Sequence, residues 1–259
     1  MATIQFSHAN GMPAPVYEPL LALLAPHKVH YLPVLGETAP PVGRDWSPLV
    51  DELIRTLEQR GGEPVVGLGH SLGAVVTLMA GRRRPDLFRR IIMLDPPLLP
   101  WRIRRLFLPL SWAGPALFKR WFPLAKGALR RRDRFDHREE AHAYWAPKSF
   151  FQSFDPACFE AYVQHALVDD GQGGLTLRIP RETEAQIFAT TPARLPQASA
   201  YIPTDYFYAI GRGAILRPHE IQEHQRRYPH IRFHAVDGGH MFPVEQPQAT
   251  AERILSLVG

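Results

Sequence analysis

Gly69-His70-Ser71-Leu72-Gly73 lies between a short apolar run, Pro64 to Leu68, and a run that favours a helix, Ala74 to Gly81. This order predicts a strand, a sharp turn and a helix, with the Ser71 hydroxyl exposed on the turn as a nucleophile. Small residues two positions before and after the serine let the strand and the helix approach closely and let the turn adopt unusual backbone angles. A glycine-rich loop carries the same five-residue pattern, so the flanking strand and helix are what favour a nucleophilic serine.

The composition is that of a folded globular chain with a substantial core. It has 259 residues, of which 45% are hydrophobic and 21% charged, enough for one large α/β domain with an insertion. Cys158 is the single cysteine, which excludes an internal disulfide and a zinc site built on paired cysteines. Residues Met1 to Ser7 lead into a predicted strand without a signal-like segment, and no apolar stretch is long enough to span a bilayer. We therefore expect a cytoplasmic protein.

The net charge of +5 is concentrated in one segment. Between Pro97 and Phe135 one acid, Asp133, accompanies ten basic residues: Arg102, Arg104, Arg105, Lys119, Arg120, Lys126, Arg130, Arg131, Arg132 and Arg134. The favoured interpretation is a solvated helix face; the alternatives are binding of anionic substrates and weak contact with an anionic membrane. Nucleic-acid binding is not expected, because no recognised binding module accompanies the charge. The oligomeric state is left open between monomer and homodimer.

The chain alternates strand and helix patterns at both ends. The predicted strands are 4–7, 28–33, 64–68, 90–94, 204–210 and 231–236, and the predicted helices are 15–24, 46–59, 72–83, 217–227 and 245–258. Short apolar strands in this alternation predict an α/β fold with a mostly parallel central sheet covered by helices on both faces. Chemistry is then expected at the carboxyl edge of the sheet.

The pattern changes between the two ends. Residues 97–195 are interrupted by prolines, rich in arginine and large aromatics, and mostly of helical period, without a clear alternating strand. We therefore predict an α/β core formed by residues 1–96 and 196–259, with residues 97–195 inserted as a mainly helical cap after the strand that ends at Asp95. Such a cap would cover the carboxyl edge.

Four features in order resemble the α/β-hydrolase superfamily over nearly the whole chain. They are the segment His8-Ala9-Asn10-Gly11 after the first strand, the 69–73 turn, Asp95 after the next strand, and Gly238-Gly239-His240 after the last. The chain looks most like compact, capped bacterial serine hydrolases with an N-terminal His-Ala-Asn-Gly segment. The resemblance implies a cofactor-free hydrolase with Ser71 in the nucleophile elbow, although the sheet is shortened at its beginning.

A serine hydroxyl needs a base, and His240 is the candidate among twelve histidines because of its place after the last strand. The carboxylate that would orient His240 is not at its most common position in this sequence. In much of the superfamily it follows the next-to-last strand, where this chain has Ala214. Asp95 is the candidate instead, since some superfamily members supply the acid from that position, and it would complete a Ser-His-Asp triad. Asp237 is a weaker rival, and a capping role for Asp95 is the structural alternative.

An oxyanion hole is expected from the backbone N–H groups of Leu72, at the start of a helix, and Asn10, with Gly11 as an alternative. The His70 side chain is expected to support the elbow, and His8 to stabilise the oxyanion segment. The histidine spacing indicates no metal site, and no phosphate-binding glycine loop is present. Dehalogenation is disfavoured because serine, not aspartate, occupies the elbow.

We expect hydrolysis of a small-molecule carboxylic ester with an apolar or aromatic acyl group, through an acyl-enzyme. The alternatives are hydrolysis of a carbon–carbon bond in a β-diketone-like compound and a ligand sensor that reuses the pocket. Trp101 and Trp145 are the candidate substrate-binding residues, although aromatics in such helices more often form the core of the cap than the pocket wall.

Overall fold

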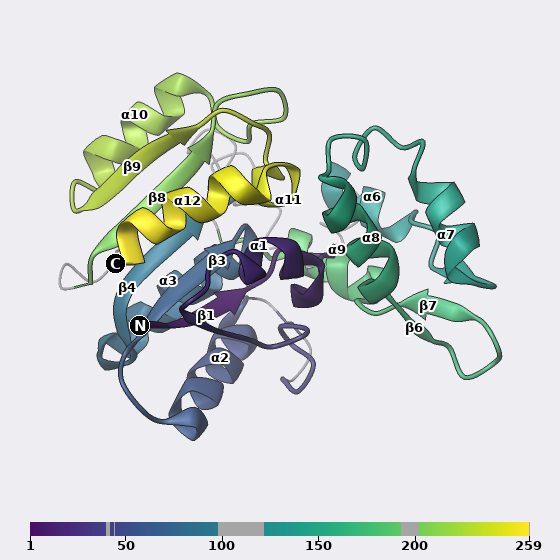
Figure 1. Ribbon diagram of the computed structural model, residues 1–259, viewed down its shortest axis with the longest axis horizontal. Coiled ribbons are helices and arrows are strands. Elements are labelled where there is room, and N and C mark those ends of the chain that lie inside the picture. Colours follow the sequence, from purple (N-terminus) through teal and green to yellow (C-terminus); the bar gives the residue numbers. More distant parts are fainter. Residues whose placement is uncertain (40–41, 44, 98–121, 193–201, 259) are drawn as a thin grey trace.

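The computed structural model describes residues 1–39, 42–43, 45–97, 122–192 and 202–258. A six-stranded sheet runs through the core in the order β2-β1-β3-β4-β8-β9, with every neighbouring pair parallel (Figure 1). Its strands are β1 (Thr3–Ser7), β2 (Lys28–Tyr31), β3 (Val65–His70), β4 (Phe88–Leu94), β8 (Thr204–Ala209) and β9 (Ile231–Val236). The predicted fold class, a parallel central sheet flanked by helices, is confirmed.

Helices cover both faces of this sheet. Alternate residues of a strand point to opposite faces, and on β4 Ile91 and Met93 belong to one apolar cluster while Ile92 and Leu94 belong to the other. The first cluster includes residues of α2 (Ser47–Arg60), α3 (Leu72–Arg83) and α10 (Pro218–Arg227). The second includes residues of α1 (Glu18–Ala22) and α12 (Pro247–Val258). All six residues of β3 are buried, as expected for a central parallel strand.

Two predicted helices are shorter or broken. The 15–24 segment forms a 3-10 turn, η1 (Ala14–Tyr17), followed by the five-residue helix α1; Pro13, Pro15 and Pro19 remove backbone donors that a continuous helix would need. The C-terminal helix is divided into α11 (Phe242–Glu245) and α12, with Pro247 as the first residue of the second helix. A second 3-10 turn, η2 (Pro85–Leu87), precedes β4.

Residues 122–192 form a smaller unit beside the main sheet (Figure 1). Its helices are α6 (Pro123–Leu129), α7 (Arg138–Trp145), α8 (Pro156–His165) and α9 (Arg181–Ala189). An antiparallel sheet of β5 (Arg134–Phe135), β7 (Leu175–Leu177) and β6 (Leu167–Asp169) accompanies them. The sequence did not predict these strands, because two or three residues are too few to show an alternating pattern.

Several residues singled out from the sequence lie outside the described part of the chain. They are Trp101, Arg102, Arg104, Arg105, Lys119 and Arg120. Within the described ranges, no helix is long and apolar enough to cross a membrane.

Candidate active site

Ser71 lies at the bend between β3 and α3, where the sequence predicts the nucleophile. Its φ of 52° is positive, which is uncommon for a residue other than glycine. The bend depends on the two flanking glycines: a Cβ on Gly73 would lie 2.1 Å from the Ser7 carbonyl oxygen, and one on Gly69 would lie 2.5 Å from the Ala74 nitrogen. The backbone N–H of Ser71 donates to the Leu94 carbonyl at 2.9 Å. Close packing therefore holds the serine in a strained conformation at the sheet edge.

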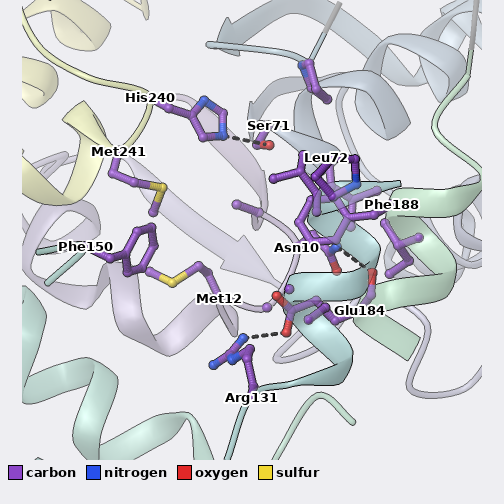
Figure 2. Close-up of a pocket in the computed structure, with 18 of the residues that line it drawn as sticks. Asn10, Met12, Ser71, Leu72, Arg131, Phe150, Glu184, Phe188, His240 and Met241 are labelled. Atoms are coloured by element: carbon purple, nitrogen blue, oxygen red, sulfur yellow. Dashed lines mark hydrogen bonds and ion pairs between the residues drawn. The ribbon is translucent and has the colours of Figure 1, made fainter. Parts of the chain in front are cut away.

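His240 bridges Ser71 and Asp95. Its Nε2 lies 3.1 Å from Ser71 Oγ, and its Nδ1 lies 2.7 Å from Asp95 Oδ2; Figure 2 shows the His240 ring directed at the serine. The three residues follow β9, β3 and β4, so the carboxyl ends of three parallel strands bring them together. Asp237, the rival acid, has an exposed side chain.

The hydrogen bonds of Asp95 indicate which nitrogen of His240 carries the proton. Asp95 is 2% exposed, and its second oxygen accepts the Ala209 backbone N–H at 3.0 Å. An ionised carboxylate only accepts hydrogen bonds, so His240 Nδ1 carries the proton and Nε2 presents its lone pair to Ser71. The His240 Nε2 atom therefore faces the serine hydroxyl as a hydrogen-bond acceptor. The carboxylate reaches the histidine from the strand after the nucleophile helix, while Ala214 occupies the more common position.

The backbone N–H groups of Asn10 and Leu72 have no hydrogen-bond acceptor within the part of the chain that the structure describes. Leu72 is the first residue of α3, where the helix dipole favours negative charge. The Asn10 segment is held against the elbow, because Gly73 N–H donates to the His8 carbonyl at 3.1 Å. In the Asn10 side chain, Nδ2 donates to the Glu184 carbonyl at 2.9 Å, whereas the buried Oδ1 has no partner among the described residues.

Two further histidines beside the site are buried and neutral. His8 Nε2 accepts the Leu35 N–H at 2.7 Å, so Nδ1 carries the proton that it donates to the Ala9 carbonyl. Burial lowers the pKa of His8 to about 4. His70 Nδ1 accepts from the Tyr17 hydroxyl at 2.6 Å, and His70 Nε2 donates to the backbone carbonyl of His240 at 3.0 Å. Its pKa is well below the ordinary value, mainly through burial and secondly through His240.

These contacts refine the sequence interpretation of both histidines. His8 does hold the oxyanion segment, through its own neighbour Ala9 and through Leu35. The His70 side chain, expected to support the elbow, also donates to the backbone carbonyl of His240, the candidate base. The sequence could not reveal this link, because His70 and His240 are 170 positions apart.

A cavity of about 710 Å³ opens beside Ser71 and His240. Trp145 lines it and is 3% exposed; it also packs edge-on against Tyr162 and Phe135, so it is both cavity wall and core of the smaller unit. Apolar side chains from both parts of the chain form much of the remaining wall, among them Met12, Phe150, Phe151, Ile187, Phe188 and Met241.

Sequence reasoning missed a polar cluster in the wall. Glu184 on α9 pairs with Arg131, which also donates to the Tyr162 hydroxyl on α8. In the sequence, Arg131 is one of ten basic residues in its segment, and nothing distinguishes Glu184 from other acids. The packing of α6 on α9 through the small residues Ala125, Ala128, Ala185 and Ala189 brings the two together. Only that packing singles them out.

The described residues contain no group of three histidine, cysteine or acidic side chains that could hold a metal ion. The arrangement that can do chemistry is therefore the serine, histidine and carboxylate at the sheet edge, facing two backbone N–H groups and an apolar cavity. Such a fold and arrangement are similar to those of α/β proteins that activate a serine hydroxyl.

The family model described as "Alpha/beta hydrolase family" matches residues 6–253, so the chain belongs to the alpha/beta hydrolase family. The abhydrolase domain-containing protein AFT2-1 of Alternaria alternata is 31% identical over 112 residues. That match covers 42% of this chain and 36% of the relative, so the alignment spans about a third of the relative's length.

Solved structures share the fold at lower identity. E-2-(acetamidomethylene)succinate hydrolase has a TM-score of 0.77 at 17% identity, over 99% of this chain and 91% of that one. A thermophilic esterase from Thermogutta terrifontis has a TM-score of 0.63 at 20% identity, over 100% of this chain and 89% of that one. The family and these hydrolase neighbours support a hydrolase.

Proposed function

We propose that the protein hydrolyses carboxylic esters of small molecules through an acyl-enzyme on Ser71. The observation that carries this proposal is the position of His240, whose two ring nitrogens contact Ser71 Oγ and the buried Asp95 carboxylate. An unassisted serine hydroxyl is a weak nucleophile at neutral pH, and a hydrogen-bonded neutral imidazole activates it. The apolar wall of the cavity favours an apolar or aromatic portion of the substrate beside the nucleophile.

Acylation would begin with attack of Ser71 Oγ on the ester carbonyl carbon while His240 Nε2 takes the hydroxyl proton. Asp95 stabilises the resulting imidazolium and keeps the ring oriented. The carbonyl oxygen becomes an oxyanion, for which the N–H groups of Leu72 and Asn10 are the proposed donors. When the tetrahedral intermediate collapses, the carbon–oxygen bond of the ester breaks, His240 gives its proton to the leaving alkoxide, and the alcohol departs.

Deacylation repeats the sequence with water. His240 removes a proton from water as the water oxygen attacks the acyl carbon, and the same two N–H groups bind the new oxyanion. Collapse then breaks the bond to Ser71 Oγ, and the proton on His240 returns to the serine. The products are the carboxylic acid and the regenerated enzyme, with one water molecule consumed in each cycle.

Turnover of a short 4-nitrophenyl ester tests the proposal. We expect steady release of nitrophenol, with labelling by a fluorophosphonate confined to Ser71 and abolished in Ser71→Ala. A single burst without turnover, or no release, would instead support a ligand sensor that keeps the pocket. Parallel assays with a β-diketone separate ester hydrolysis from carbon–carbon hydrolysis, because cleavage of the diketone alone would contradict the proposal.

A further inference from the structure

The mostly apolar cavity beside Ser71 has more cations than acids in its described lining. Among its described lining residues, the cationic side chains are Arg130, Arg131, Arg132 and Lys148, and the single acid is Glu184. Low-dielectric walls of one charge sign concentrate the electrostatic field inside a cleft. An apolar substrate with no charge would gain nothing from this field, whereas an anionic one would.

Two of these four cations have ion-pair partners. Arg132 pairs with Glu140, and Arg131 pairs with Glu184. The Lys148 ammonium lies 3.9 Å from the centre of the Tyr144 ring, a contact that orients the cation without neutralising it. Arg130 is exposed, and within the described ranges its side chain has no ion-pair partner. The described lining of the cavity therefore keeps a net positive charge through Arg130 and Lys148.

Arg131 is the cation that is built into the wall. Its side chain is 26% exposed and that of Glu184 is 9% exposed, and Figure 2 shows the two together, away from His240. Glu184 and the buried Tyr162 hydroxyl hold the guanidinium from two sides. A guanidinium has five N–H donors, and only two of these donors have side-chain acceptors among the described residues. The guanidinium is thus fixed in place with donors to spare.

We propose that the natural substrate carries a carboxylate in addition to its ester, and that Arg131 binds this carboxylate while the ester lies at Ser71. This inference deepens the proposed function and rests on it for the position of the ester. Arginine donors bind carboxylates through charge-assisted, often paired hydrogen bonds. A carboxylate suits the site better than a phosphate, because it brings a single negative charge close to Glu184, whereas a phosphate monoester brings nearly two.

The matched pair of monomethyl adipate and dimethyl adipate isolates the effect of the charge. Both ligands have the same chain and a methyl ester, and only the first has a free carboxylate. Titration calorimetry on the Ser71→Ala variant measures binding without turnover. We expect the monoester to bind about tenfold or more tightly at low ionic strength, as one charge-assisted pair allows, and the advantage to shrink as salt is added. Equal or tighter binding of dimethyl adipate would overturn the inference.

Substitutions then assign the effect to one residue. Arg131→Met in the same background should reduce the advantage of the monoester about tenfold. Lys126→Gln is the matched control, since Lys126 is exposed on the neighbouring helix α6 and does not line the cavity; it should retain the advantage. If Arg131→Met unfolds because Glu184 loses its partner, the double variant Arg131→Met with Glu184→Gln removes both charges together. If the monoester still binds more tightly than the diester in Arg131→Met or in the double variant, Arg131 does not bind the carboxylate.

Hydrolysis by the wild-type chain separates this inference from the proposed function. If the monoester binds through Arg131 but neither ester is cleaved, the carboxylate site stands and ester hydrolysis is wrong. If both esters are cleaved with equal kcat/KM and bind equally, ester hydrolysis stands and the carboxylate site is wrong.

Discussion

The sheet edge and the cavity wall differ in how their residues are brought together. Ser71, Asp95 and His240 each follow a strand of one parallel sheet, so the register of β3, β4 and β9 determines their separation. Arg131, Glu184 and Tyr162 come from three segments of the smaller unit, joined by the packing of helices. The edge can therefore be located from local strand, turn and helix patterns. The wall cannot, because its residues share no local pattern.

The largest effect that we expect concerns the edge. His240→Ala should reduce kcat on a 4-nitrophenyl ester about as much as Ser71→Ala does, on the order of a millionfold, because members of a triad act as one unit. The rate of nitrophenol release at saturating substrate measures kcat, and circular dichroism checks that both variants remain folded. If His240→Ala retains more than about a tenth of wild-type turnover, another group is the base, since positioned base catalysis supplies about two orders of magnitude or more.

The next effect tests the departure of this chain from the common position of the acid. Asp95→Asn should leave the fold intact and reduce kcat on the order of ten-thousandfold, because an amide at this position favours the wrong histidine tautomer. Adding Ala214→Asp should restore part of the loss if the two positions reach the same nitrogen of His240. Wild-type turnover in Asp95→Asn would remove Asp95 from the mechanism and leave either a serine–histidine dyad or a different acid.

These two experiments concern the part of the site that the sequence could locate. The five-residue turn predicted the bend at Ser71. Because Ala214 occupies the usual position of the acid, Asp95 became the candidate, and its Oδ2 lies 2.7 Å from His240 Nδ1. The six core strands could also be predicted, because each is a short apolar run between helical patterns; two of the predicted core helices are interrupted at prolines. The catalytic roles stay predictions.

What the sequence could not provide depends on contacts between distant segments. The β5, β6 and β7 strands are too short to show a period, and the link from His70 to the His240 carbonyl joins residues 170 positions apart. Arg131 looked like its nine basic neighbours in the sequence. Trp101, predicted to bind substrate, lies outside the described residues, whereas Trp145 lines the cavity.

A third prediction concerns the pH dependence of stability at the edge. Burial lowers the pKa of His8 to about 4 and that of His70 well below its ordinary value. The unfolded chain therefore binds protons below about pH 6.5 that the folded chain does not bind. The stabilisation is fully present above that pH and is lost as the pH falls toward 4. For His8 alone the loss is about 3 kcal/mol.

Denaturant titrations between neutral and mildly acidic pH measure this dependence. His8→Gln should flatten it, because glutamine cannot bind the proton. His219→Gln on the exposed face of α10 is the control and should leave the profile unchanged. A profile for His8→Gln that parallels the wild type would show that His8 does not contribute to the acid transition.

The smallest effect lies where the edge and the wall meet, at Gly11. Its φ is +71°, and an added Cβ would lie 2.9 Å from the Glu184 carboxyl carbon and 3.0 Å from an Arg131 guanidinium nitrogen. Gly11→Ala should therefore cost about 1–2 kcal/mol in the free energy of unfolding through backbone strain. It should also reduce kcat several-fold, because the proposed oxyanion donor on Asn10 would shift with its neighbour.

Gly61→Ala separates these two contributions. Gly61 has a similar φ of +63°, but an added Cβ there would meet nothing within 4 Å. We expect both variants to lose stability in denaturant titrations through backbone strain, and only Gly11→Ala to lose turnover. The loss in Gly11→Ala should appear in kcat more than in KM, because an oxyanion donor acts mainly on the transition state. Equal turnover in the two variants would show that the wall does not constrain the oxyanion segment, and that the two regions are independent.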